Sequence, residues 1–207
     1  MKLIARILIA LLSAYIVTKS ARYLDFDITG ILLDKGEIVE SLWYRIMFFL
    51  HVVFGSIALL VWPWQFIKRL RSKLMRFHRF LGKIYVVSCL IGGFAGFCIS
   101  FFATGGPIGK LGFAIAGILW FVLTYIAYRR VIDGDILSHE KWMIFSFAMT
   151  FAAVTLRVWL GVLIGVFGLS YINAYMTVAW LSWMPNLFVA LLIINRINSK
   201  VLKTHTS

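Results

Sequence analysis

Long apolar runs alternate with short polar segments along almost the whole chain. Six of these runs have helical length and few charges, at residues 3–18, 42–67, 80–103, 108–128, 142–167 and 174–194. A helix rises ~1.5 Å per residue, so about twenty apolar residues cross the ~30 Å hydrocarbon core of a bilayer. The pattern therefore predicts an all-α fold, an integral membrane bundle of six transmembrane helices that forms a single domain.

The composition supports the membrane class and argues against a soluble protein. Hydrophobic residues make up 62% of the chain, and the mean hydropathy is +0.92, whereas ordinary globular domains are about 45–50% apolar. The net charge of +13 would suggest nucleic acid in a soluble protein. Here the basic residues lie between the apolar runs, so we expect no nucleic-acid partner. Six helices and short loops leave no room for a soluble catalytic domain.

The distribution of lysine and arginine predicts the orientation. Seven of them and no acidic residue lie between Lys68 and Lys83, whereas segment 21–41 carries five of the eight acidic residues. Cytoplasmic loops carry an excess of positive charge. We therefore predict a basic cytoplasmic loop over 68–79, an outer loop over 21–41, and both termini in the cytoplasm. Anionic lipid headgroups are the expected partners of the basic loop within the lipid bilayer.

The first apolar run has two interpretations. Lys2 and Arg6 precede a short apolar stretch, as in a secretory signal peptide. The residues that follow it lack a clear small-x-small cleavage step. We interpret residues 3–18 as an uncleaved first transmembrane helix, with a cleaved signal peptide as the alternative.

Polar side chains interrupt the apolar runs at His51, Arg157 and Asn186. An ionisable residue inside a membrane is costly and indicates a functional site by default. Each shares a helix face with small residues, the kind of face that packs against other helices in lipid. Helical rise places His51 and Arg157 at a similar depth in the outer half of the bilayer, with Asn186 nearer the midplane. We predict that these three and Tyr175 share a ligand-binding cavity that opens outward, and we add Gln65, on the same face as His51, to the ligand-binding candidates.

Arg157 has no acidic residue in the last five apolar runs to pair with. It therefore needs water, carbonyl oxygens, a carboxylate of the outer loop such as Asp25 or Asp27, or an anionic ligand. A purely structural hydrogen-bond network around Arg157 is the alternative.

A second polar layer is predicted at the cytoplasmic ends of two helices. His78 and His139 each precede an apolar run by a few residues. Imidazoles on facing helices ligate haem or a metal ion, so this pair is the candidate cofactor site, with b-type haem as the cofactor. Structural capping of the helix starts and contact with an anionic headgroup are the alternatives. We expect an apolar stretch between the two layers.

Several motifs together resemble a bacterial family of predicted membrane proteins that has no assigned function. The motifs are His51-x3-Gly55 leading to Gln65, His78-Arg79-x-Leu81-Gly82-x2-Tyr85, Trp120, His139-x2-Trp142-Met143, Leu156-Arg157, and Trp183-x2-Asn186. The resemblance covers roughly residues 50–190 and implies a multi-pass protein of the bacterial inner membrane. Two positions depart from the family pattern: Trp62 replaces a glycine before Pro63, and Ala190 or Leu191 replaces a glutamate. The resemblance implies no reaction.

Three functions remain open from the sequence. The first is a redox or cofactor-binding membrane protein that holds a b-type haem or a quinone. The second is a transporter of a small solute or anion. The third is an accessory subunit that assembles with another membrane complex, or with copies of itself, through its small-residue faces. The chain shows no nucleophile–base set, phosphate loop or metalloprotease motif, so it indicates no enzyme activity, and we predict no metal-ion site apart from the haem.

Overall fold

The computed structural model describes residues 3–23 and 30–205. The long helices are α1 (Leu3–Ser20), α2 (Leu42–Gln65), α4 (Met75–Ser100), α5 (Gly106–Ile132), α6 (Ile136–Gly165), α7 (Tyr171–Leu181) and α8 (Met184–His205). The shorter elements are α3 (Lys68–Lys73) and two 3-10 helices, η1 (Ala21–Tyr23) and η2 (Gly30–Glu40). Every regular element in the described ranges is helical, which confirms the predicted all-α class.

Five stretches of the described chain are long and apolar enough to cross a membrane. They are α2, α4, α5, α6 and the stretch Tyr171–Ser199, which joins α7 to most of α8. The first predicted run is also helical, as α1, but among the described residues it is not one of these five. Five membrane-length helices are therefore shown, and a sixth span stays a prediction.

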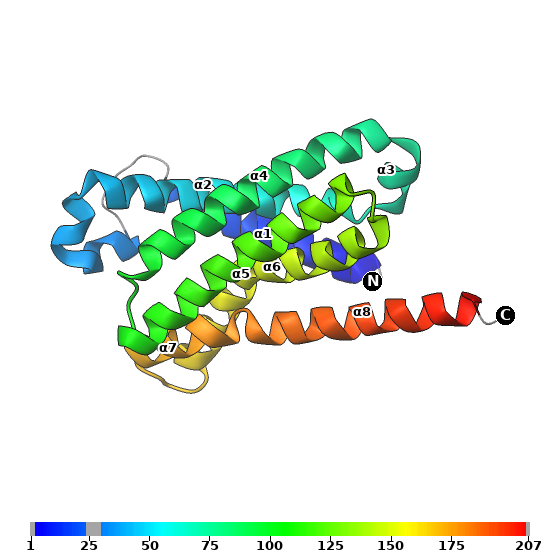
Figure 1. Ribbon diagram of the computed structural model, residues 1–207. Coiled ribbons are helices and arrows are strands. Elements are labelled where there is room, and N and C mark those ends of the chain that lie inside the picture. Colours follow the sequence, from blue (N-terminus) through cyan, green and yellow to red (C-terminus); the bar gives the residue numbers. More distant parts are fainter. Residues whose placement is uncertain (1–2, 24–29, 206–207) are drawn as a thin grey trace.

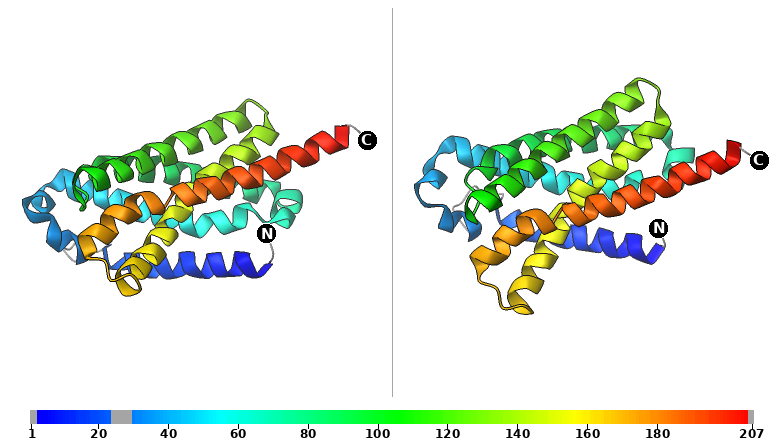
Figure 2. Two further views of the ribbon diagram at one scale, coloured as in Figure 1. Left: turned by 90° about the horizontal axis from the view of Figure 1, so that it is seen from below. Right: turned by 60° about the horizontal axis from the view of Figure 1, so that its bottom comes forward.

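The helices form an antiparallel bundle in chain order. Helix α2 packs on α4, α4 on α5, and α5 on α6, with α1 against α2 and α8 against α6. Both termini lie at the same end of the bundle as α3 and the α5–α6 turn (Figures 1 and 2). We call this the basic end, because it carries the basic segment from Lys68 to Lys83. The segments η1 and η2 lie at the opposite end (Figure 1).

Close approach between α4 and α5 depends on glycine. A Cβ atom on Gly93 would lie 3.1 Å from the backbone nitrogen of Phe121, and one on Gly117 would lie 2.7 Å from that of Phe97. Small residues let helix backbones meet directly, which is the usual way that helices associate in lipid. This contact brings the polar face of α4 against α5 and sets the position of the site.

Helix boundaries differ from the predicted apolar runs in several places: η1 and η2 occupy part of the predicted outer loop 21–41, α5 and α6 extend beyond their runs, and two further differences bear on the site. Segment 68–79 was predicted as a loop, but α3 and the first residues of α4 occupy it, so His78 is helical, as is His139 in α6. Hydropathy marks where a helix enters lipid, whereas basic residues have ample helix propensity and continue the helix beyond that point. The predicted helix 174–194 is divided at Ser182 and Trp183, because Pro185 has no N–H to donate to the preceding turn.

Candidate functional site

A cavity of 410 Å³ lies between η1–η2, the end of α1, and helices α2, α4, α5, α6 and α7. Its walls are mainly apolar and aromatic. Four basic residues line it, and within the described ranges no aspartate or glutamate does; the basic residues are Lys19, Arg22, Lys35 and Arg157. The cavity therefore offers a ligand an apolar wall and a positive potential.

His51 enters this cavity from α2 in a defined tautomer. Its Nδ1 lies 2.9 Å from the carbonyl oxygen of Gly92. A carbonyl can only accept, so Nδ1 donates its hydrogen, and Nε2 of the neutral ring is an acceptor. The imidazole meets the ring of Trp120 edge-on, with centroids 6.3 Å apart. A Cβ on Gly96 would lie 2.7 Å from Nδ1, so glycine there provides the room for the ring.

Arg157 reaches the same cavity from α6. Its Nη1 donates to the carbonyl oxygen of Ala153, one turn earlier, over 2.7 Å. No carboxylate of the described residues forms an ion pair with it. The outer-loop candidates Asp25 and Asp27 lie outside the described residues. The guanidinium thus has further donors that face the cavity.

Tyr175 also lines the cavity, from α7, whereas Asn186 does not. The Asn186 amide nitrogen donates towards the carbonyl oxygens of Ala148 (3.2 Å) and Ser182 (2.8 Å) and the hydroxyl of Thr155 (3.1 Å). These contacts tie α8 to α6 across the helix break. The structure therefore places Asn186 behind the cavity wall, in a structural hydrogen-bond network.

Gln65 lies far from His51, at the last residue of α2. Fourteen residues of helix separate the two, or ~21 Å. Gln65 is only 8% exposed, and its side-chain oxygen lies 3.5 Å from the Cβ position of Gly82, one turn after His78. Two buried atoms here have no hydrogen-bond partner among the described residues: Gln65 Nε2 and His78 Nδ1. Gln65 thus lies with His78 and His139 at the basic end, and we call these three residues the histidine layer.

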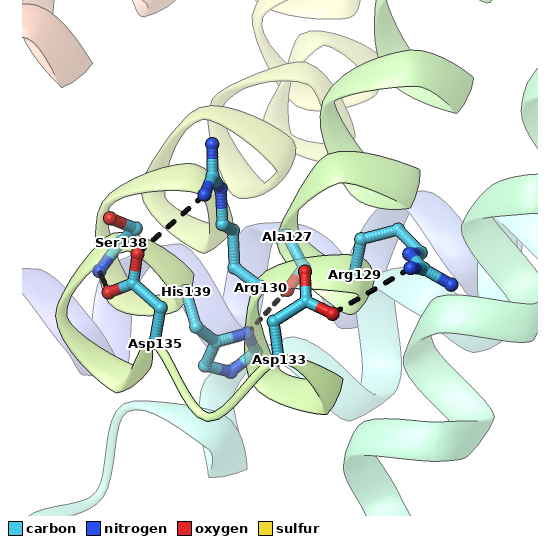
Figure 3. A network of polar contacts seen from close by, with 7 residues as sticks. All are labelled: Ala127, Arg129, Arg130, Asp133, Asp135, Ser138 and His139. Atoms are coloured by element: carbon cyan, nitrogen blue, oxygen red, sulfur yellow. Dashed lines mark hydrogen bonds and ion pairs between the residues drawn. The ribbon is translucent and has the colours of Figure 1, made fainter.

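His139 completes this layer from α6 (Figure 3). Its Nδ1 donates to the carbonyl oxygen of Ala127 over 2.8 Å, which leaves Nε2 as an acceptor in the neutral ring. His139 is near enough to His78 to act on it electrostatically. Within the described chain no cluster of three or more His, Cys, Asp or Glu side chains could hold a metal ion.

The turn beside His139 is held by a capped helix start (Figure 3). The Asp135 carboxylate accepts from the Ser138 backbone N–H over 3.0 Å, and ion pairs join Arg129 to Asp133 and Arg130 to Asp135. Hydrogen bonds from the Ser138 side chain and backbone lower the pKa of Asp135 below its usual range. Asp135 therefore caps α6 as a carboxylate, which orients His139 four residues later.

The prediction of an apolar stretch between the two polar layers is wrong. Buried hydroxyls from α4, α5 and α6 fill this region: Tyr85, Thr124, Ser146 and Thr150. Their mutual hydrogen bonds let them lie in a low-dielectric interior, so hydropathy does not reveal them. All four share faces with small residues, a pattern visible in the sequence; for Thr124 these are Gly117, seven residues earlier, and Ala127, three residues later.

Five membrane-length helices with polar side chains turned inward define a multi-pass membrane protein. The family model "Predicted membrane protein (DUF2306)" matches residues 48–194, and the chain belongs to this family. The resemblance inferred from the motifs is thereby confirmed. No curated protein and no solved structure matches the chain.

Proposed function

We propose that the outer cavity binds a quinol or a similar lipid-soluble ring that carries hydroxyl groups. One observation carries this proposal: His51, whose Nε2 is an acceptor, and Arg157, which has donors beyond its bond to Ala153, line one largely apolar cavity. A quinol offers a complementary set of groups, because its O–H donates to the imidazole and its second oxygen accepts from the guanidinium.

The remaining walls fit such a molecule. Ligand pockets are usually about 300–1,000 Å³ and mostly apolar, with a few placed polar groups, and this cavity of 410 Å³ is of that kind. Trp120 and Tyr175 supply flat faces against which a ring can stack. Helices embedded in lipid give such a ligand an approach from the bilayer.

Binding of a short-chain ubiquinol to detergent-purified protein tests the proposal. We expect saturable quenching of tryptophan fluorescence in the wild type and loss of binding in His51→Phe, which keeps a ring but removes the acceptor. The matched control is His78→Phe at the basic end, where the buried Nδ1 has no hydrogen-bond partner among the described residues. Equal affinity of His51→Phe and the wild type would contradict the proposal.

A second candidate follows from the basic lining. Four cations without an acidic residue among the described lining side chains also suit a small anion, as in a transporter. Binding of a water-soluble anion such as benzoate, without binding of ubiquinol, would favour this function. The same purified protein tests the haem hypothesis for His78 and His139, because a bound b-type haem gives a strong Soret absorption band.

We also propose the finer localisation and contacts that the charge pattern suggests. The basic end would face the cytoplasm in a bacterial inner membrane, with anionic headgroups near Arg76 and Arg79, which are exposed on α4. Assembly with another membrane protein, or with a second copy, stays a proposal that rests on the small-residue faces.

A further inference from the structure

Four hydroxyls form a continuous hydrogen-bonded chain that begins at the wall of the cavity. Thr150 Oγ1 lies 2.8 Å from the Tyr85 hydroxyl, Tyr85 lies 3.1 Å from Ser146 Oγ, and Ser146 lies 2.6 Å from Thr124 Oγ1. The four side chains come from α4, α5 and α6, and all are at most 2% exposed. The chain is therefore shielded from lipid.

The hydrogens of this chain have two complete orders. In the first, Thr150 donates to Tyr85, Tyr85 to Ser146, Ser146 to Thr124, and Thr124 to the carbonyl oxygen of Trp120 over 2.7 Å. In the second, every donation is reversed, and Thr150 donates to the carbonyl oxygen of Ser146 over 3.2 Å. Trp120 Nε1 donates to Thr150 in both, over 2.9 Å. Since each order has an acceptor for every hydrogen, the chain can switch between them.

The outer end of the chain is accessible from the cavity, because Thr150 and Trp120 line it beside His51. The inner end points to the histidine layer. His78 precedes Tyr85 by seven residues on α4, and His139 precedes Ser146 by seven on α6. Seven residues are about two helical turns, so each pair shares a face, ~10 Å apart along its helix.

The histidine layer has unfilled hydrogen-bonding capacity. Gln65 Nε2 and His78 Nδ1 are buried without a partner among the described residues. Buried polar groups in this state are usually bonded to ordered water. Ordered water at these atoms would extend hydrogen bonding from Thr124 and Ser146 towards the imidazoles of His78 and His139, whose ring nitrogens can donate and accept hydrogen bonds.

We propose that Thr150, Tyr85, Ser146 and Thr124 form a proton relay between the cavity and the layer of His78, His139 and Gln65. A proton that arrives at Thr150 moves inward by breaking one O–H bond and forming the next at each step. One proton enters at Thr150 and one leaves from Thr124 to a water on the side of the histidine layer, so the chain passes from the first order to the second with no net change in its hydrogens, and rotation of the hydroxyls restores the first order. No electron moves, and the relay does not depend on which ligand fills the cavity.

Proton flux into liposomes tests the relay. Purified protein is reconstituted with an internal pH-sensitive dye, and a potassium gradient with valinomycin drives proton entry. We expect wild-type vesicles to acidify faster than protein-free vesicles. Tyr85→Phe, which removes only the hydroxyl that joins Thr150 to Ser146, should lose this additional flux.

Matched variants separate loss of the relay from loss of the fold. Ser88→Ala removes another buried hydroxyl from the same helix as Tyr85, and it should conduct like the wild type. Thr124→Ser keeps a hydroxyl and should conduct, whereas Thr124→Val should not. Elution as a single symmetric peak in size-exclusion chromatography verifies the fold of each variant.

Two results would overturn the relay. One is wild-type flux no greater than that of protein-free vesicles. The other is wild-type flux in folded Thr124→Val or Tyr85→Phe. Ubiquinol binding is measured separately, so failure of the relay leaves the proposed ligand site standing, and the reverse also holds.

Discussion

Gly96 determines how much room the imidazole of His51 has. A methyl group at this position would lie 2.7 Å from Nδ1 and 2.9 Å from Cε1 of the ring, closer than non-bonded atoms can approach. The ring is also held by its edge-on contact with Trp120 and by the hydrogen bond from Nδ1 to the carbonyl oxygen of Gly92. The orientation of the His51 ring thus depends on Gly96, which has no side chain. The direction of the Nε2 acceptor depends on it in turn.

Gly96→Ala should therefore displace His51 and weaken ubiquinol binding. Overpacking an interior typically costs about 1–3 kcal/mol, so we also expect a lower Tm in detergent. The matched control is Gly161→Ala on α6, where a Cβ meets no atom within 4 Å, and where the better helix propensity of alanine should preserve or slightly raise the Tm. Equal Tm and equal affinity for the two variants would contradict this account of Gly96.

At the scale of elements, the break between α7 and α8 is held by Asn186 of α8 and by Thr155 of the neighbouring helix α6. Helix breaks in membranes leave carbonyl groups that need new donors. Asn186 and Thr155 both donate to the carbonyl oxygen of Ser182, and Asn186 also reaches Ala148 on α6. The carbonyl oxygen of Ser182 at the break thus has hydrogen-bond donors, and the break is a stable structural feature at the edge of the cavity.

Asn186→Ala should lower stability and leave the ligand site largely intact. Loss of buried hydrogen-bond partners costs roughly 1–3 kcal/mol, which should appear as a lower Tm in detergent. The control is Asn195→Ala on the same helix, where the side chain is exposed. Loss of ubiquinol affinity without a change in Tm would instead give Asn186 the ligand-binding role that the sequence predicted.

At the scale of the whole molecule, the densest run of basic residues lies at one end of the bundle. The basic segment from Lys68 to Lys83 and both termini lie together, opposite η1 and η2 (Figure 1). Translocation disfavours basic loops, so the basic end should stay in the cytoplasm. The exposed turn at Gly168 should then face the other side.

Reporter fusions test this orientation. Green fluorescent protein at the C-terminus should fluoresce, because it folds in the cytoplasm, and alkaline phosphatase at the same position should be inactive. Alkaline phosphatase inserted after Gly168 should be active. Reversed activities at the two positions would contradict the proposed orientation.

Sequence reasoning located some site residues well and others poorly. Depth along the helices predicted that His51, Arg157 and Asn186 share a cavity with Tyr175; His51, Arg157 and Tyr175 line it, whereas Asn186 does not. The sequence also grouped Gln65 with these ligand-binding candidates. In the structure Gln65 lies about four turns from His51 along the same helix. A shared helix face does not bring together two residues that lie about four turns apart along that helix.

The sequence by itself determined the all-α membrane class, the family and the identity of the polar side chains, because hydropathy, charge and motif spacing are local properties. Only the tertiary structure decided which polar groups meet. Thr124 joins Ser146, Asn186 joins Thr155, and Gln65 lies beside Gly82. Such pairs depend on the rotation and closeness of neighbouring helices, which the packing of many small residues sets together and which the spacing within one helix does not specify.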